Sequence, residues 1–376
     1  MKRWCAALAA VLLLSAPAGA AGAAPAVEAQ AAVLMEQETG TVLFEHNAHD
    51  KLEPASVTKV MTLLLVMEAV DSGRLTLDEP VTVSANAASM GGSQVYLKEN
   101  EQMTVDELLK AVAVVSGNDA AVALAEHLSG SEAAFVERMN QRAAELGMSD
   151  THFVNCTGLP AAGHLTSAYD IAVMSRELMR HPGIQNYTTI WMDSLRGGQF
   201  QLSNTNKLVR YYDGCTGLKT GSTDSAGYCL SATAERDGLS LIAVVLKADT
   251  SQQRFDTAQN LLNFGFANYT LLDVQPGAAL PPVTVLLGEQ SQVQPAVSGP
   301  ARVLVERDKL DLVTTQIRLA GDVEAPVEEG QILGELVVLV DGQERQSIPL
   351  VARSGVERIS VGGIFSRLLR ALLLAG

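Results

Sequence analysis

The stretch PASVTKVMTLLLVM at residues 54–67 places a serine and a lysine three positions apart, directly before an apolar run. Proline near a helix start and serine in the first turn are both start signals, so a helix is predicted to begin near Ser56. Residues i and i+3 lie on one face of a helix, and Lys59 can therefore reach the hydroxyl of Ser56. A lysine that is held neutral there is a base for a serine nucleophile. The pair indicates acyl transfer through a covalent acyl-serine intermediate.

The segments around this stretch predict a catalytic unit over residues 25–270. Residues 31–46 alternate around a turn and predict an antiparallel hairpin, and residues 56–180 are mostly helical in pattern. Three further strands and a closing helix are predicted at residues 214–220, 227–233, 239–247 and 251–269. This order predicts an α/β fold of the α+β kind, with an antiparallel sheet beside a helical lobe. The cleft between sheet and lobe is the expected site.

Ser116-Gly117-Asn118 is a second motif, and it follows a predicted apolar helix. With Ser56 as the nucleophile, Lys59 is the candidate proton acceptor and Ser116 the candidate relay of a proton to the leaving amine. Asn118 is a candidate for hydrogen bonding both the substrate amide and a lysine. Lys59 accepts a proton only when it is neutral, so burial and a nearby cation are expected to lower its pKa.

Lys219-Thr220-Gly221 is a third motif, in one of the returning strands, and Ser222 follows it. Lys219 is the candidate for the nearby cation and for binding a substrate carboxylate, to which Thr220 adds a hydroxyl. Gly221 lets a substrate lie against the strand edge like an added strand. The backbone N–H groups of Ser56 and Ser222 are predicted to form an oxyanion hole.

Residues 1–20 are predicted to be a secretory signal peptide, with alternative cleavage sites up to residue 24. Lys2-Arg3 is the charged start, and Ala6–Leu14 is an apolar stretch too short to span a bilayer. Loss of the two basic residues changes the formal net charge from -15 to -17, which argues against nucleic acid as a partner. The signal peptide predicts that the protein is exported.

Three cysteines, Cys156, Cys215 and Cys229, remain in the mature chain, and an odd number leaves at least one free thiol. Whether Cys215 and Cys229 pair stays open, because both flank a predicted hairpin without having to face each other. We favour the interpretation that the cysteines are small, buried apolar side chains. No cysteine–histidine cluster has metal-ligand spacing, and neither a metal nor another cofactor is expected.

The C-terminal part of the chain differs in pattern from the catalytic unit. Short alternating runs punctuated by proline and glycine predict a small all-β domain over residues 272–356, which we interpret as a spacer or a binding module. In the last segment, residues 359–376, apolar side chains recur at helical spacing. This predicts an amphipathic helix, too short to cross a bilayer, that anchors the protein at the membrane surface. Packing on the β domain or on a partner is the alternative.

S-x-x-K followed by S-D-N and K-T-G is the signature of penicillin-binding proteins and class A β-lactamases, and the second motif is Ser-Gly-Asn in this chain. On these motifs, on Asn204-Thr205-Asn206-Lys207 and on the trailing β domain and helix, nearly the whole mature chain resembles the D-alanyl-D-alanine carboxypeptidases, the low-molecular-mass penicillin-binding proteins. The resemblance implies a penicillin-binding transpeptidase fold, removal of the terminal D-alanine from peptidoglycan stem pentapeptides, and acylation by β-lactam antibiotics. Together with the signal peptide and the terminal helix, it implies action at the extracytoplasmic face of the cell membrane, against the cell wall. Cys156 departs from the family, which often carries proline there.

Other activities share parts of this pattern. A β-lactamase shares all three motifs, but class A enzymes resemble one another in a Glu-x-x-Leu-Asn loop that we do not find in this chain. A DD-endopeptidase that cuts cross-links is barely separated from a carboxypeptidase by sequence. A non-enzymatic β-lactam sensor or wall-binding protein is disfavoured by the complete motif set.

Three other titratable residues are interpreted as structural. His164 stands where the family often has a histidine, and we expect it to make a structural hydrogen bond rather than to act in catalysis. Glu145 and Glu177 are carboxylates of the kind that activate a deacylating water, but both fall at solvated positions of predicted helices. A surface role is therefore favoured for both.

Overall fold

The computed structural model describes residues 24–299 and 301–374, and a five-stranded sheet forms the centre of its catalytic unit. The strand order is β2-β1-β9-β8-β7, and all neighbouring strands are antiparallel, as predicted. The strands are β1 (Ala31–Glu36), β2 (Val42–His46), β7 (Cys215–Thr223), β8 (Gly227–Arg236) and β9 (Leu239–Ala248). The last strand in this order, β7, lies at an edge of the sheet. The predicted signal peptide, residues 1–20, falls outside the described residues.

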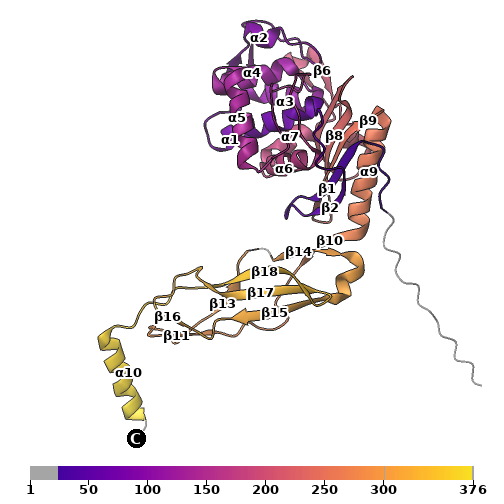
Figure 1. The fold of residues 1–376 in the computed structure, drawn as a ribbon. Coiled ribbons are helices and arrows are strands. Elements are labelled where there is room, and N and C mark those ends of the chain that lie inside the picture. Colours follow the sequence, from indigo (N-terminus) through magenta and orange to yellow (C-terminus); the bar gives the residue numbers. More distant parts are fainter. Residues whose placement is uncertain (1–23, 300, 375–376) are drawn as a thin grey trace, which may run out of the picture.

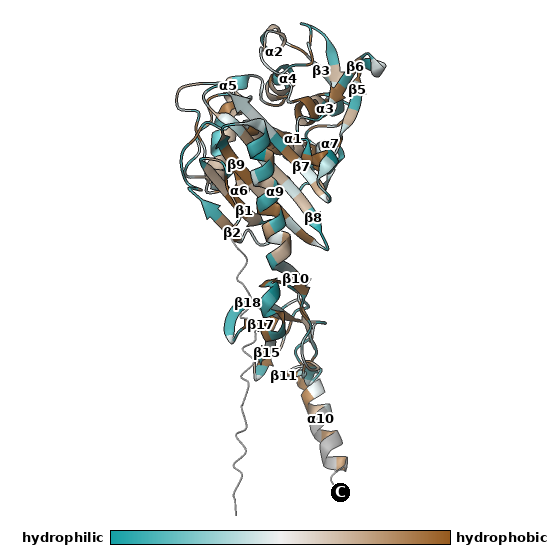
Figure 2. Cartoon of the chain, turned by 90° about the vertical axis from the view of Figure 1, so that its right-hand side faces the viewer, coloured by the Kyte–Doolittle hydropathy of each residue, from teal (hydrophilic) through white to brown (hydrophobic). Residues whose placement is uncertain are grey.

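Both faces of this sheet are covered by helices. Figure 1 shows the helical lobe on one side and α9 (Ser251–Asn268) on the other, and Figure 2 shows α9 crossing the sheet with mainly hydrophilic residues outward. Side chains of a strand alternate between faces, so Val33 and Met35 join the core of the lobe whereas Leu34 joins the core under α9. Because β9 is buried on both faces, it carries the continuous apolar run Leu241–Leu246 instead of an alternating pattern.

The helical lobe is inserted between β2 and β7 and is built around α1 (Lys59–Asp71). Nearly all of α1 is buried, which explains why its sequence has no polar face. The next long helix, α3, begins with a capping box of Thr104 and Glu107. The lobe comprises η1 (Ala55–Thr58), β3 (Pro80–Thr82), α2 (Ala85–Ala88), β4 (Gln102–Thr104), α3 (Val105–Val115), α4 (Asn118–Ser129), α5 (Glu132–Glu145), α6 (Ala168–Leu178), η2 (Pro182–Ile184), α7 (Gln185–Thr188), β5 (Met192–Leu195), η3 (Arg196–Gly198), β6 (Phe200–Ser203) and α8 (Leu208–Tyr211).

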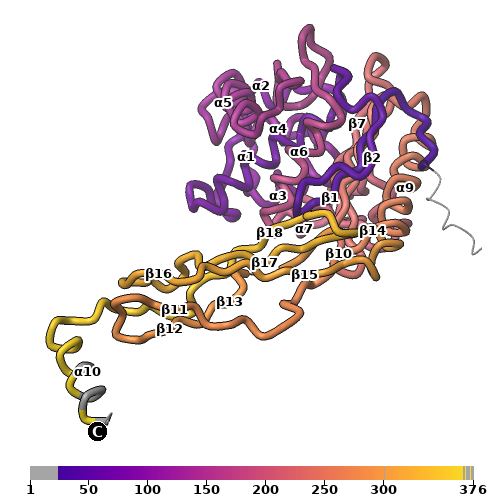
Figure 3. Tube along the Cα trace, turned by 60° about the horizontal axis from the view of Figure 1, so that its bottom comes forward, coloured from indigo at the N-terminus to yellow at the C-terminus, as the bar shows by residue number. Residues whose placement is uncertain are grey.

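The C-terminal β domain follows α9 without a break. Its first strand, β10 (Tyr269–Asp273), pairs with β14 (Arg302–Glu306), and Leu271 and Leu304 pack against the core under α9. The remaining elements are β11 (Val283–Leu286), β12 (Gln292–Val293), β13 (Pro295–Val297), η4 (Arg307–Leu312), β15 (Val313–Leu319), β16 (Asp322–Glu324), β17 (Ile332–Val340), β18 (Gln343–Ala352) and α10 (Val361–Leu374). Figures 1 and 3 show this domain extending away from the catalytic unit, with α10 at its far end.

The strand register decides the question of the cysteines. Cys215 lies opposite Ala234, whereas Cys229 lies opposite Gly221, so the two thiols do not face each other across the β7–β8 hairpin. Cys156, Cys215 and Cys229 are all free. Burial of Cys156 and Cys229 confirms the interpretation that these are small core side chains, while Cys215 is half-buried.

Candidate active site

Ser56 and Lys59 meet at the junction of η1 and α1. Ser56 lies on the 3₁₀ turn, and Lys59 is the first residue of the α-helix. The Lys59 Nζ donates hydrogen bonds to Ser56 Oγ at 2.9 Å and to the Thr157 carbonyl at 2.7 Å. Burial lowers the pKa of Lys59 from 10.5 to about 7, although the charges of Cys156 and Asp119 raise it. Near neutral pH a large share of Lys59 is therefore free of its proton and able to accept one.

The segment around Thr157 supports this pair from the other side. The Asn155 Oδ1 accepts the backbone N–H groups of Thr157 and Gly158, at 3.2 and 2.7 Å, and so shapes the turn that presents the Thr157 carbonyl. Gly158 has φ +82°, and a Cβ on it would lie 1.8 Å from the Ala55 carbonyl oxygen. Only glycine therefore lets the turn approach the residue before Ser56 this closely. A sequence does not show which backbone carbonyl lies near a side chain. The Thr157 carbonyl could therefore not be predicted as a hydrogen-bond partner of Lys59.

The second motif forms the junction of α3 and α4. Ser116 ends α3 in the left-handed conformation, with φ 65°, and Asn118 begins α4. The Asn118 Nδ2 donates to the Gly91 carbonyl at 2.7 Å. No group of the described residues pairs with Ser116 Oγ or Asn118 Oδ1, although both atoms are buried. Buried polar atoms nearly always have partners, so these two are suited to contact a substrate.

Asp119, next in the chain, holds a neighbouring loop against this motif. Its buried carboxylate accepts the backbone N–H groups of Val95 and Leu97, both at 3.0 Å. The Asn118 N–H adds a bond of 2.7 Å to the Ser93 carbonyl. Since the charge of Asp119 also acts on Lys59, the start of α4 lies close to the amine. The structure thus brings the second motif next to the first.

The third motif lies on the edge strand β7. Lys219 is buried, and its Nζ donates to the Thr220 carbonyl at 2.9 Å. Burial, followed by the charges of Lys59 and Arg254, lowers the Lys219 pKa well below its usual value. The prediction that burial lowers the Lys59 pKa is confirmed, but no nearby cation is among the causes that lower it. The charge of Lys59 instead lowers the pKa of Lys219. Thr220 is almost fully buried and Ser222 is exposed.

Arg254 contacts β7 from α9, and no motif in the sequence marks it. It lies on α9, and its Nη1 donates to the carbonyls of Gly221 and Cys229 at 3.0 and 3.3 Å. An arginine in an amphipathic helix normally lies on the exposed face, so the sequence does not distinguish the buried Arg254 from a surface arginine.

Gly221 is the point of closest contact between β7 and the nucleophile turn. A Cβ on Gly221 would lie 2.8 Å from Pro54 O, 2.8 Å from Ser56 N and 2.9 Å from Val57 N. We expect Gly221→Ala to push β7 and the turn apart, lowering the free energy of unfolding by about 1–3 kcal/mol and the rate of acylation by roughly 100-fold. Thermal unfolding and ampicillin acylation measure the two effects.

Gly321→Ala is the matched control for this substitution, because a Cβ on Gly321 meets no atom within 4 Å. It should leave both quantities unchanged. If Gly221→Ala is acylated by ampicillin at the wild-type rate, the close approach of β7 to the Ser56 turn has no part in the reaction.

The other titratable residues that the sequence raised lie in structural contacts. The His164 Nδ1 accepts the Val154 N–H at 3.1 Å, and its Nε2 bonds Thr58 Oγ1 at 2.8 Å. Burial lowers the His164 pKa to about 4, so the ring is neutral and the structural interpretation is confirmed. Glu145 and Glu177 both form ion pairs with Arg142. The Glu145 side chain is 49% exposed, as predicted, whereas that of Glu177 is only 20% exposed because it also pairs with Arg180.

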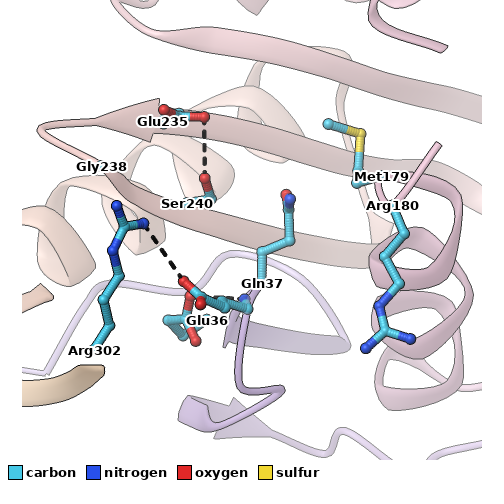
Figure 4. Close-up of a pocket in the computed structure, with 9 residues that line it drawn as sticks. Glu36, Gln37, Met179, Arg180, Glu235, Gly238, Ser240 and Arg302 are labelled. Atoms are coloured by element: carbon cyan, nitrogen blue, oxygen red, sulfur yellow. Dashed lines mark hydrogen bonds and ion pairs between the residues drawn. The ribbon is translucent and has the colours of Figure 1, made fainter. Parts of the chain in front are cut away.

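A separate pocket of about 430 Å³ lies between the catalytic unit and the β domain, and Figure 4 shows it in close-up. Its polar groups pair with protein: Glu36 accepts the backbone N–H of Thr39, and Ser240 donates to Glu235. Its lining includes no residue of the three motifs. Within residues 24–299 and 301–374, no group of three or more His, Cys, Asp or Glu side chains is arranged to hold a metal ion.

The three motifs, brought together on η1–α1, the α3–α4 junction and β7, have the arrangement of a serine acyl-transferase with a lysine base. A family model described as D-alanyl-D-alanine carboxypeptidase matches residues 18–250, and one described as penicillin-binding protein 5, C-terminal domain, matches residues 274–358. The chain belongs to the D-alanyl-D-alanine carboxypeptidase family, as the motifs predicted.

Individual relatives agree over most of the chain. The D-alanyl-D-alanine carboxypeptidase DacF of Bacillus subtilis is 41% identical over 336 residues, covering 88% of this chain and 86% of the relative. Penicillin binding protein 5 of Haemophilus influenzae has a TM-score of 0.79 at 30% identity, covering 89% of this chain and 99% of the other. Penicillin-binding protein D2 of Listeria monocytogenes, solved in its ampicillin-bound form, has a TM-score of 0.59 at 36% identity, covering 64% of this chain and 98% of the other. The predicted penicillin-binding fold is confirmed.

Proposed function

We propose that this chain is a serine-type D-Ala-D-Ala carboxypeptidase that removes the terminal D-alanine from peptidoglycan stem pentapeptides through an acyl-Ser56 intermediate. The observation that carries the proposal is the 2.9 Å hydrogen bond between Lys59 Nζ and Ser56 Oγ, in surroundings that lower the Lys59 pKa to about 7. Membership of the family gives the reaction class. The pair gives that reaction its nucleophile and its base.

Acylation begins when Ser56 Oγ attacks the carbonyl carbon of the penultimate D-alanine and its proton passes to Lys59. The backbone N–H groups of Ser56 and Ser222 hold the oxyanion that forms. The C–N bond then breaks, and Ser116 relays the proton held by Lys59 to the departing nitrogen, which leaves Lys59 neutral again. D-alanine leaves, and the peptide remains as an ester of Ser56.

Deacylation repeats these steps with water in place of the serine. Water adds to the ester carbonyl and gives its proton to Lys59, and Ser56 Oγ leaves with the proton that Lys59 returns. The products are the shortened peptide acid and the free enzyme. Because the same amine serves both halves of the reaction, its pKa near 7 suits both.

Substrate binding uses the edge of the sheet. No strand of the described residues pairs with the outer side of β7, so the peptide lies along this strand at Gly221 and Ser222 like an added strand. Lys219 and Thr220 bind its terminal carboxylate, and Asn118 Oδ1 accepts an amide N–H. A carboxylate beside the buried Lys219 raises the pKa of that lysine and keeps it charged while substrate is bound.

β-Lactam antibiotics acylate the same serine, and the resulting ester is hydrolysed slowly. A β-lactamase needs a base that activates water against the penicilloyl ester, and a carboxylate does this in class A enzymes. In this structure the carboxylate of Asp119 holds backbone N–H groups, and that of Glu132 accepts from Cys156. Asp119 uses both of its oxygens in such bonds, and Glu132 uses its Oε1. The carboxypeptidase is therefore favoured over the β-lactamase.

Ampicillin separates the two activities. Intact-protein mass spectrometry should find one ampicilloyl adduct per chain, located on Ser56 by peptide mapping and persisting for many minutes after free drug is removed. Rapid turnover of ampicillin without D-alanine release from a peptide acid would support the β-lactamase instead.

We also propose that the protein is exported and that α10 anchors it at the extracytoplasmic face of the cell membrane. In α10 the apolar side chains of Ile364, Phe365, Leu369 and Leu373 are exposed. No helix among the described residues is long and apolar enough to cross a membrane. An exposed apolar helix at the far end of the β domain is suited to lie in the lipid interface and to hold the catalytic unit away from it, toward the wall (Figure 1).

Deletion of residues 361–376 is expected to move the protein from the membrane fraction to the soluble fraction. Phe365→Ser should weaken cosedimentation with lipid vesicles by roughly 10- to 100-fold, because a buried aromatic side chain is lost from the interface. Ser366→Gln, at the next and polar position, is the control and should bind as the wild type does. Equal membrane association of the deletion variant and the full chain would contradict the anchor.

A further inference from the structure

Helix α5 holds residues 153–158, the segment that presents the Thr157 carbonyl to Lys59. This helix lies beside α1 in the helical lobe (Figure 1). The Asn140 Oδ1 on α5 accepts the Phe153 N–H at 2.8 Å, and the Nδ2 of the same side chain donates to the Phe153 carbonyl at 2.8 Å. The start of the segment is thus fixed to α5 through both backbone groups of one residue.

Cys156, the residue before Thr157, is held by side chains from two helices. Glu132, the first residue of α5, accepts the Cys156 N–H on its Oε1 at 3.2 Å, and the Cys156 Sγ donates to the same oxygen at 3.4 Å. From α1, the Thr62 Oγ1 donates to the Cys156 carbonyl at 2.7 Å. Cys156 is fully buried, so water is not at hand to replace these bonds.

The place of the next carbonyl decides how Lys59 meets Ser56. The Lys59 Nζ lies 2.7 Å from the Thr157 carbonyl oxygen and 2.9 Å from Ser56 Oγ. A carbonyl oxygen only accepts hydrogen bonds, so a neutral Lys59 directs one of its two protons to Thr157. This leaves the lone pair of the amine available to the Ser56 hydroxyl. A shift of the carbonyl would turn the lone pair away from the proton that it has to accept.

Cys156 needs a hydrogen-bond acceptor that proline would not need. The family often carries proline at this position, and proline has no backbone N–H. Cys156 brings both an N–H and a thiol into a fully buried position, where a donor without an acceptor is costly. Glu132 accepts both with one oxygen.

We propose that Glu132 is a positioning residue of the carboxypeptidase reaction. By holding Cys156 it keeps the Thr157 carbonyl in place, and that carbonyl directs the lone pair of Lys59. Glu132 acts through the segment and not on the reacting atoms themselves. This inference rests on the proposed function, in which Lys59 is the base.

The rate of ampicillin acylation at several drug concentrations separates the chemical step from the affinity for the drug. Glu132→Ala should lower the rate constant at saturating ampicillin by roughly 10- to 100-fold, because a displaced carbonyl misdirects the base. The concentration that gives half of this rate should change by less than about threefold. Glu132→Gln, which keeps an oxygen for the Cys156 N–H, should stay within about fivefold of the wild type. Glu137→Ala is the control and should be unchanged, because Glu137 is exposed on the same helix.

Replacing Cys156 tests whether Glu132 acts through it. Cys156→Pro removes the N–H and the thiol together, so Glu132 has no donor to hold there. We expect Glu132→Ala with Cys156→Pro to be acylated at least about fivefold faster than Glu132→Ala alone, because loss of both partners costs less than loss of one. In the Cys156→Ala background, which retains the N–H, Glu132→Ala should still slow acylation by roughly tenfold. Thermal unfolding checks that every variant is folded.

These results distinguish positioning of the base from general support of the fold. A wild-type acylation rate in Glu132→Ala would overturn the inference and leave the proposed function standing. Equal losses in Glu132→Ala and Glu132→Gln, or a double variant no faster than Glu132→Ala, would also overturn it, because the hydrogen bond to Cys156 would then have no part in the reaction. Failure of the wild type to release D-alanine from a pentapeptide would contradict the proposed function, and the inference with it.

Discussion

Replacing Ser56 with alanine is expected to abolish both D-alanine release and the ampicillin adduct. The variant loses the atom that attacks the carbonyl, and Lys59 then has no hydroxyl to deprotonate. Where nucleophile and base act as a unit, loss of either removes nearly all of the catalysis, so we expect kcat/KM to fall by about 10⁴-fold or more. Alanine removes a single oxygen from a half-buried position, and the fold should be retained.

Release of D-alanine from a synthetic pentapeptide, followed by chromatography, measures the first loss, and intact mass after ampicillin measures the second. Ser72→Ala is the matched control, because Ser72 stands just after the same helix and its hydroxyl bonds the Glu68 carbonyl. It should behave as the wild type does. D-alanine release that survives in Ser56→Ala would place the nucleophile elsewhere.

Replacing Lys59 with arginine is expected to lower kcat/KM by about 10³-fold or more, because a guanidinium stays protonated and cannot serve as a base. The wild type should show the corresponding pH dependence. Since burial lowers the Lys59 pKa to about 7 and only the neutral amine accepts a proton, kcat/KM should fall about tenfold for each pH unit below 7 and level off above it.

The pH profile of ampicillin acylation measures this limb without interference from product release. Lys51→Arg is the control, because Lys51 is exposed and pairs with Asp150 at the surface. A profile that is flat between pH 5 and 8 would show that no group with a pKa near 7 acts as the base. Acylation by Lys59→Arg at the wild-type rate would exclude Lys59 from that role.

The sheet and the helices of the catalytic unit could be predicted from sequence because their apolar patterns are strong and local. The hairpin of β1 and β2 alternates about a turn, and the capping box at Thr104 marks the start of α3. The apolar run Leu241–Leu246 predicts a core strand, and the structure covers it on both faces. In each case the residues that determine the element lie within it, so no distant contact had to be known.

The motif residues of the site could be predicted for a different reason. Serine, lysine and asparagine side chains at these spacings carry the chemistry, and the three motifs lie on elements that the fold brings together. Contacts made by the backbone were not predictable in this way. The Thr157 carbonyl binds Lys59, and Gly221 approaches the Ser56 turn because of packing between segments far apart in the chain.

Whether two cysteines on neighbouring strands form a disulfide could not be predicted from sequence either. The choice between bridged and free thiols at Cys215 and Cys229 depends on the register of β7 and β8, which a shift of one residue would alter. The hydrogen bond between Thr205 and Thr220 likewise depends on where the turn at residues 204–207 lies between α3 and β7. Such residues are found only when the contacts themselves are seen.

The central claim is that Ser56 and Lys59 form the nucleophile and base of a D-Ala-D-Ala carboxypeptidase. Incubation of the purified protein with a stem pentapeptide ending in D-Ala-D-Ala tests it most directly, with free D-alanine measured over time. The claim predicts one D-alanine and one tetrapeptide for each peptide consumed, in a reaction that stops when ampicillin occupies Ser56. An intact pentapeptide, or D-alanine release that ampicillin does not inhibit, would contradict it.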